Sequence, residues 1–95
     1  MKPIAWNGEN NEWLLRKRGV CFEDILFYLE KGMLLDDISH PNPEQYGDQR
    51  MFVVDIENYA YLVPYVEKED EIFLKTIFPS RKATKKYLKD QKWRI

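Results

Sequence analysis

The feature that most constrains the fold is a change in hydrophobic spacing near residue 33. Up to that point apolar residues recur at helical intervals, as they do between Phe22 and Leu29. Beyond it they alternate, so that Phe52 and Val54 fall on one face of an extended segment. The first spacing is typical of an amphipathic helix and the second of a strand with one buried face. Because helices and strands occupy separate stretches, we predict an α+β domain.

Two helices are predicted before this change, after a short opening strand over residues 3–6. The first helix spans 10–18, where Asn7 offers an N-cap and Gly19 ends the helix. The second helix spans 22–31 and begins with acidic residues, which the positive end of a helix dipole favours. Both helices end at a glycine, which is the usual residue just beyond a helix.

The rest of the chain is predicted to be an antiparallel meander closed by one helix. Strands are expected over 33–38, 49–57, 59–66 and 71–78, and the helix runs from 81 to about 90 with Ser80 as its N-cap. A loop rich in proline separates the first two of these strands, at 39–48. Pro64 lies inside a strand and predicts an edge or a bulge there. The predicted order is βααββββα, with the helices on one side of a mainly antiparallel sheet, in a single domain over residues 1–95.

The charges of the chain are divided unevenly between its two parts. Residues 75–95 hold eight basic residues and one acidic residue, a net charge of +7. Residues 1–74 hold seven basic and fifteen acidic residues, a net charge of −8, so the whole chain has a net charge of −1. Solubility alone does not require this separation. It favours a surface that binds a polyanion.

The composition also makes several kinds of catalytic and binding site unexpected. Cys21 is the only cysteine, so no internal disulfide is expected, and a reducing compartment such as the cytoplasm fits best. One cysteine and one histidine do not make a zinc site of the usual ligand types, and no glycine-rich phosphate loop is present. His40 lies in the proline-rich loop, where an exposed side chain is the simplest interpretation. No cofactor, metal site or membrane span is expected, because no apolar run approaches the roughly 20 residues that cross a bilayer.

The closing helix places cations where they disfavour the helix. Arg81 and Lys82 lie in the first turn, where the dipole makes each unfavourable by about 0.3–1 kcal/mol. Arg81 with Lys85, and Lys82 with Lys86, are like-charge pairs one turn apart, each unfavourable by about 0.2–0.5 kcal/mol. A bound phosphate would reverse both effects, because Ser80 and the free N–H groups of the first turn also favour an anion. A solvated surface explains any single lysine, whereas the cluster favours a functional surface.

Other polar side chains in the strands admit two interpretations each. Lys75 is expected to share a face with Phe73 and Ile77, either as a lysine that protects a sheet edge or as part of a site. Three tyrosines alternate in one strand, where they either stack on bases or are half-buried in the sheet. They are Tyr59, Tyr61 and Tyr65.

Arg50 opens the apolar face of its strand. It is expected either to pair with a carboxylate, such as that of Asp48 or Asp36, or to point into a site. Asp36 and Asp37 are adjacent acidic residues at the end of a strand. Since consecutive strand residues point to opposite faces, these two carboxylates do not form a catalytic dyad.

Several short motifs occur in order along the chain. They are Lys17-Arg18-Gly19-Val20, Phe22-Glu23, Arg50 before a strand, and Ser80-Arg81-Lys82-Ala83-Thr84 before the last helix. Their order and spacing resemble those of the BrnT-type toxins of bacterial type II toxin–antitoxin systems, over nearly the whole chain. The resemblance implies a RelE-like fold and an endoribonuclease that needs no metal. It also implies a cognate antitoxin, through which alone the toxin contacts DNA.

In toxins of this kind the 2′-hydroxyl of RNA attacks the adjacent phosphate, and basic side chains stabilise the charge that develops. On this interpretation the RNA substrate would be cut by the catalytic candidates Arg81, Arg50 and Lys75. The candidates for binding RNA are Lys17, Arg18, Lys82, Lys85, Lys86 and Tyr87, of which Tyr87 or Lys85 could also donate a proton.

The chain departs from the family pattern at three places. Arg18 stands where the family has histidine, Trp6-Asn7 where it has Trp-Asp, and Cys21 where it has a serine. The departure at Arg18 supports an alternative, a non-enzymatic binding module or decayed toxin whose basic face takes a protein or nucleic-acid partner. A third possibility is an interaction domain unrelated to toxins. Cleavage of RNA distinguishes the ribonuclease from the binding module, because a binding module shifts the mobility of RNA without cutting it.

Overall fold

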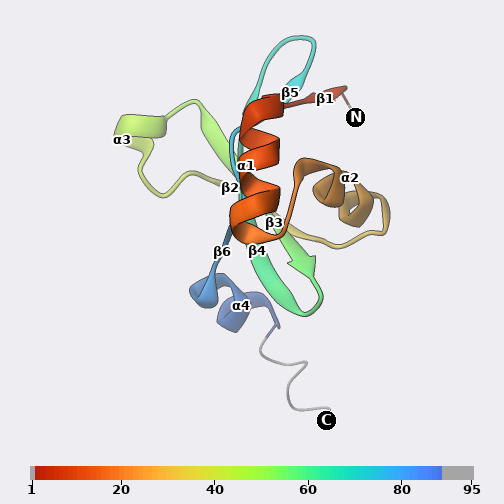
Figure 1. Cartoon of the computed structure of the whole chain (residues 1–95). Helices are drawn as coiled ribbons and strands as arrows, with labels where there is room; N and C mark the ends of the chain where they lie inside the picture. The colour runs from red at the N-terminus through yellow and green to blue at the C-terminus, as the bar shows by residue number, and fades with distance from the viewer. Residues whose placement is uncertain (1, 89–95) are drawn as a thin grey trace.

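The computed structural model describes residues 2–88, which form one sheet with helices on both faces (Figure 1). Its elements are β1 (Ile4–Ala5), α1 (Gly8–Arg18), α2 (Phe22–Glu30), β2 (Leu34–Ser39), α3 (Pro43–Tyr46), β3 (Gln49–Ile56), β4 (Tyr59–Glu67), β5 (Ile72–Leu74), β6 (Phe78–Pro79) and α4 (Arg81–Leu88). The predicted α+β class is confirmed. The short helix α3 inside the predicted loop was not expected. The predicted helix end near residue 90, and Lys89, Lys92 and Arg94 of the basic cluster, lie outside the described residues.

The sheet has the strand order β1-β5-β4-β3-β2, and β6 also pairs with β4. Among the described strands, β1 and β5 form the one parallel pair, and the other pairs are antiparallel. The longest ladder joins β3 to β4, from the pair Gln49–Val66 to the pair Ile56–Tyr59. The predicted turn between them is confirmed, because Glu57 and Asn58 both have positive φ angles, 52° and 69°, as a tight hairpin turn requires.

Pro64 lies in β4, which is paired on both sides and is therefore a central strand. Its carbonyl accepts the N–H of Lys75 at 2.8 Å, so the side on which Pro64 lacks an N–H faces β5 and β6. Strand β5 pairs with residues 65–67 and β6 with residues 61–62, which leaves the ladder interrupted beside Pro64. The predicted edge is wrong because β4 is a central strand, but the predicted irregularity is present, since residues 63 and 64 of β4 face the three residues 75–77. The irregularity falls in the neighbouring segment, where the predicted strand 71–78 is split in two.

The two faces of the sheet bury different cores. Phe52 and Val54 of β3 belong to the core beneath α1 and α2, whereas Val53 belongs to the core beneath α4. The run from Met51 to Val54 is at most 4% exposed at every position. A continuous apolar run of this kind is typical of a strand covered on both faces. The expectation that all helices lie on one side is therefore wrong, and this run was the signal in the sequence that contradicts it.

The predicted helix caps are confirmed by hydrogen bonds and backbone angles, although α1 begins at Gly8, two residues before its predicted start. The side chain of Asn7 accepts the N–H of Asn10 at 2.8 Å at the start of α1. Gly19 ends α1 with a φ of 70°, in the left-handed region. Ser80 Oγ accepts the N–H of Ala83 at 3.1 Å at the start of α4. Within residues 2–88 no helix combines the length and the apolar character needed to cross a membrane.

Candidate functional site

Helix α4 holds four basic side chains in solvent because its other side is fixed to the sheet. Thr84 is buried, and its hydroxyl donates to the carbonyl of Ser80 at 2.8 Å and accepts the N–H of Ala60 at 2.9 Å. Ala83 and Leu88 on the same side are buried in the core beneath α4. The exposed residues on the opposite side are Arg81, Lys82, Lys85 and Lys86. We call these four residues the α4 basic cluster.

Tyr87 fastens α4 to the edge strand β2. Its hydroxyl donates to Asp36 Oδ2 at 2.6 Å, and the Nζ of Lys86 lies 5.2 Å from the centre of its ring. The hydrogen bond lowers the pKa of Asp36 and raises the pKa of Tyr87. The hydroxyl hydrogen of Tyr87 is engaged in this hydrogen bond to Asp36. Tyr87 therefore positions the helix and is poorly placed to donate a proton to RNA.

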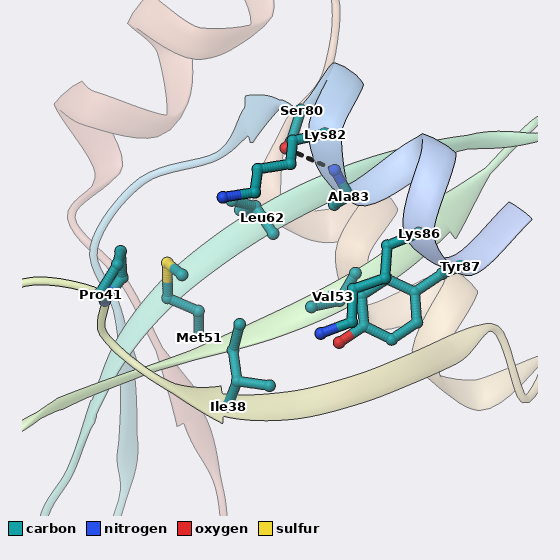
Figure 2. A pocket seen from close by; sticks show the side chains of 10 residues that line it. All are labelled: Ile38, Pro41, Met51, Val53, Leu62, Ser80, Lys82, Ala83, Lys86 and Tyr87. Carbon is teal, nitrogen blue, oxygen red and sulfur yellow. Dashed lines mark hydrogen bonds between the residues drawn. The ribbon is translucent and has the colours of Figure 1, made fainter.

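A groove runs beside α4 over the same face of the sheet, as Figure 2 shows. Its volume is about 250 Å³. Side chains from three strands form an apolar floor, and lysines and a tyrosine of α4 form one rim. The floor residues are Ile38, Met51, Val53 and Leu62, and the rim residues are Lys82, Lys86 and Tyr87. We call this feature the α4 groove.

Arg50 lies on the other face of the sheet and is engaged in an ion pair. Its Nε is 3.1 Å from Asp37 Oδ1, and one of its terminal nitrogens donates to the Asp37 carbonyl at 2.8 Å. The partner is thus Asp37 rather than Asp36 or Asp48. Tyr65 donates to both carboxylate oxygens of Asp37 at 2.8 Å. Burial first, and this hydrogen bond second, raise the pKa of Tyr65 to about 12.

A second cavity, of about 280 Å³, lies beside Arg50 and contains the histidine. His40 is half-buried rather than exposed, and its ring centre is 4.4 Å from that of Tyr46 in α3. Its Nδ1 accepts the N–H of Asn42 at 3.1 Å, which places the proton of the neutral ring on Nε2. The packing of the unpredicted helix α3 explains the difference from the expected exposed loop.

The three alternating tyrosines do not form a platform for bases. Tyr65 is only 2% exposed, and its ring stacks on that of Phe52 with the ring centres 4.1 Å apart. Tyr61 packs against the same core, whereas Tyr59 is exposed. The interpretation as half-buried side chains of the sheet describes Tyr61 best.

Lys75 lies in the segment between β5 and β6. Its side chain is exposed, with Nζ 5.6 Å from the centre of the Phe73 ring. Ile77 is fully buried in the core beneath α1 and α2, so it does not share a face with Lys75 as predicted. The break beside Pro64 explains this, because it interrupts the strict alternation of a continuous strand.

Lys17 and Arg18 form the end of α1, where the helix dipole favours cations. Lys17 is exposed. The guanidinium of Arg18 donates to the carbonyl of Ile77 and lies 5.3 Å from the centre of the Trp13 ring. Arg18 therefore joins α1 to the segment that leads into β6, and this contact gives it a structural role.

The structure does not bring the three predicted catalytic residues together. Arg50 lies on the face covered by α1 and α2, and Lys75 lies on the opposite face beside Phe73. Arg81 follows Ser80, whose N–H donates to Ala60, five residues along β4 from the partner of Arg50. At about 3.3 Å per strand residue, these positions are about 17 Å apart. The residues that do lie together are those of the α4 basic cluster.

The contacts of Thr84 and Asp37 were not predicted from the sequence. Thr84 is part of the motif at the start of α4, four residues after Ser80, and a polar residue in the buried stripe of a helix is a usable signal. Asp37 left no such signal, because its pairing depends on the register between β2 and β3. Among residues 2–88 no group of three acidic, histidine or cysteine side chains is placed to hold a metal ion.

Comparisons with protein-family models, with curated proteins and with solved structures find no match to this chain.

Proposed function

We propose that this chain is a metal-independent endoribonuclease toxin of a type II toxin–antitoxin system, acting in the cytoplasm and inhibited by a cognate antitoxin. The observation that supports the proposal best is the α4 basic cluster, whose four cations are exposed on one helix. Their mutual repulsion is unfavourable in the free protein. A phosphate backbone would relieve this repulsion, and it would also satisfy the first N–H groups of α4.

The proposed reaction centres on Arg81 at the start of α4. The 2′-oxygen of RNA would bond to the adjacent phosphorus, while the bond from phosphorus to the 5′-oxygen breaks. The 2′-hydroxyl loses its proton, the departing 5′-oxygen gains one, and a cyclic phosphate is left. The planar guanidinium of Arg81 would bind two phosphate oxygens as negative charge develops, and Lys85 would hold the next phosphate.

This proposal changes the parts given to Arg50 and Tyr87. Arg50 is paired with Asp37, and it lies about 17 Å along the sheet from the start of α4, so it would stabilise β2 and β3. The hydroxyl of Tyr87 is held by Asp36. The proposed reaction centre would therefore contain fewer residues than the sequence indicated, with Arg81 as its principal group.

A second candidate function is a binding module that holds RNA without cutting it. The observation in its favour is that the catalytic candidates are spread over two faces of the sheet and that Arg50 and Tyr87 are engaged by carboxylates. Such a module would use the same α4 basic cluster. Its affinity for RNA would fall steeply with salt, because each phosphate contact releases a counterion.

Growth and RNA integrity in a bacterial host without an antitoxin separate the two functions. The wild type should arrest growth and leave cleaved RNA, and Arg81→Ala should do neither. Arg16→Ala is the matched control, since Arg16 is an exposed arginine of α1 outside the proposed site. Cleavage by purified Arg81→Ala at the wild-type rate would refute the role of Arg81.

The same proteins, once purified and shown to be folded, should then be tested on labelled RNA in the presence of EDTA. Cleavage supports the nuclease. A mobility shift that weakens with salt and leaves the RNA intact supports the binding module. If folded wild type neither shifts nor cuts RNA at low salt, both proposals fail.

A further inference from the structure

The two faces of the sheet are covered unequally. Helices α1 and α2 cover one face, whereas α4 is the one helix of residues 2–88 that packs on the other, where it contacts β4 (Figure 1). The α4 groove lies on the less covered face, over β2 and β3. Ile38 and Leu62 in its floor are only half-buried. Apolar side chains of the sheet thus remain accessible on this face beside a single short helix.

The spacing of the sheet leaves room for one more helix beside α4. Neighbouring strands are about 4.8 Å apart, and helices packed side by side have axes about 8–10 Å apart. A helix next to α4, which lies over β4, would therefore lie about two strands away, over β2. That is the position of the groove and of Ile38 in its floor. We infer that the α4 groove docks an acidic amphipathic helix of a partner protein.

The rim of the groove determines the charge of this partner. Lys82 and Lys86 lie one helical turn apart and border the floor, and Figure 2 shows the Lys82 side chain extending over Leu62. Carboxylates spaced one turn apart on a docked helix would face both ammonium groups. The apolar side chains of that helix would then contact the floor between the carboxylates and the sheet.

The same side chains argue against two other occupants. The floor is aliphatic, and the one aromatic ring that lines the groove, Tyr87, has the Nζ of Lys86 5.2 Å from its centre, so the groove is poorly suited to stacking bases. A second copy bound about a twofold axis would place the lysines of one α4 against those of the other, because such a contact uses the same surface twice. The inference does not depend on RNA cleavage, since it concerns Lys82 and Lys86 beside the floor rather than Arg81.

A display library of helical peptides tests the inference directly. The library would be selected on the full-length wild type, and the enriched peptides would be measured by fluorescence anisotropy. We expect enriched sequences to carry acidic residues one turn apart on the edge of an apolar stripe. The double variant Lys82→Glu/Lys86→Glu should bind them at least tenfold more weakly. The control Arg16→Glu/Lys17→Glu makes the same change of charge on α1 and should bind them like the wild type.

A floor variant and a measurement of assembly complete the test. Ile38→Thr keeps a residue suited to an edge strand, and it should weaken peptide binding while the thermal unfolding of the protein remains cooperative. The inference is overturned if no peptide binds below about 1 mM, if enriched peptides lack acidic residues, or if both double variants lose binding equally. It is also overturned if sedimentation shows a wild-type dimer that Ile38→Thr dissociates. An RNA mobility shift lost in Ile38→Thr would instead assign the groove to RNA.

Discussion

Asp36 and Asp37 are consecutive residues of β2, yet each accepts a hydrogen bond from a tyrosine on a different face of the sheet. Tyr87 of α4 donates to Asp36 at 2.6 Å, and Tyr65 of β4 donates to Asp37 at 2.8 Å. The alternation of side chains in a strand separates the two carboxylates. Strand β2, at the edge of the sheet, therefore makes polar contacts on both faces of the sheet. The prediction that these two side chains point to opposite faces of the sheet is confirmed.

The contact between Tyr87 and Asp36 should make the free energy of unfolding decrease at acidic pH. This hydrogen bond, before any other cause, lowers the pKa of Asp36 below its ordinary value of 3.8. A carboxyl with a lowered folded pKa stabilises the fold fully above its unfolded pKa, and loses this effect as the pH falls through its folded pKa. Between about pH 6 and about pH 2 the wild type should lose more unfolding free energy than Tyr87→Phe. Urea unfolding at a series of pH values measures the difference.

Tyr59→Phe is the control for that experiment, because Tyr59 is an exposed tyrosine with no carboxylate partner among the described residues. It should follow the acid response of the wild type. Parallel curves for wild type and Tyr87→Phe would show that the hydrogen bond to Asp36 contributes nothing in solution.

The hydroxyl of Tyr65 should make stability depend on base. Its pKa is raised from 10.0 to about 12. A tyrosine with a raised pKa stabilises the fold below its unfolded pKa and loses this effect as the pH rises toward the folded value. Tyr65→Phe should be less stable than the wild type by about 1 kcal/mol at pH 7. The gap should narrow between pH 10 and about pH 12. A gap that stays constant over this range would contradict the assigned contact.

Thr84 should contribute to stability through its hydroxyl. Thr84→Val keeps the shape of the side chain but leaves the N–H of Ala60 without its partner in a buried position. The expected loss is about 1–3 kcal/mol of unfolding free energy. Thr84→Ser keeps the hydroxyl and should lose less. Chemical denaturation of the three proteins measures both values, and equal losses in the two variants would assign the effect to packing.

RNA binding should depend on salt through the α4 basic cluster. For single-stranded RNA, each lost phosphate contact lowers the slope of log K against log salt by about 0.7. Lys85→Ala should therefore reduce both affinity and slope. Lys31→Ala removes an exposed lysine at the end of α2 and should change neither. Titration of labelled single-stranded RNA at several salt concentrations gives the slopes. An unchanged slope in Lys85→Ala would remove Lys85 from the interface.

Sequence alone predicted those features of the fold that depend on neighbouring residues. The caps at Asn7 and Ser80 and the end of α1 at Gly19 involve hydrogen bonds and angles within one turn. The irregularity at Pro64 was predicted, but its extra residue lies in the facing segment, about ten residues further along the chain, which the sequence did not indicate. Local patterns do not show on which side of a strand its partner lies.

The candidate site could be predicted only in part, because local patterns do not give the pairing of strands. The α4 basic cluster is contiguous in sequence, so one helix is enough to bring it together. The pairing of Arg50 with Asp37 requires the register of β2 against β3, which includes an irregularity between Leu34 and Asp36. The separation of Arg50 from Arg81 requires the order of the strands as well. Neither is specified by spacing within a single segment.

The turn at Glu57 and Asn58 bears on how fast the chain folds. It closes the longest ladder of the sheet, and it holds glutamate at a φ of 52°, a conformation unfavourable by roughly 1 kcal/mol for a residue with a side chain. We expect the turn to form before the hydrogen bonds between the two strands that it joins. The unfavourable angle therefore falls at the earliest step, where few native contacts yet offset it. We therefore expect the barrier to folding to be set partly at two residues just before Ala60, whose backbone groups bond to Ser80 and Thr84 and so hold the start of α4.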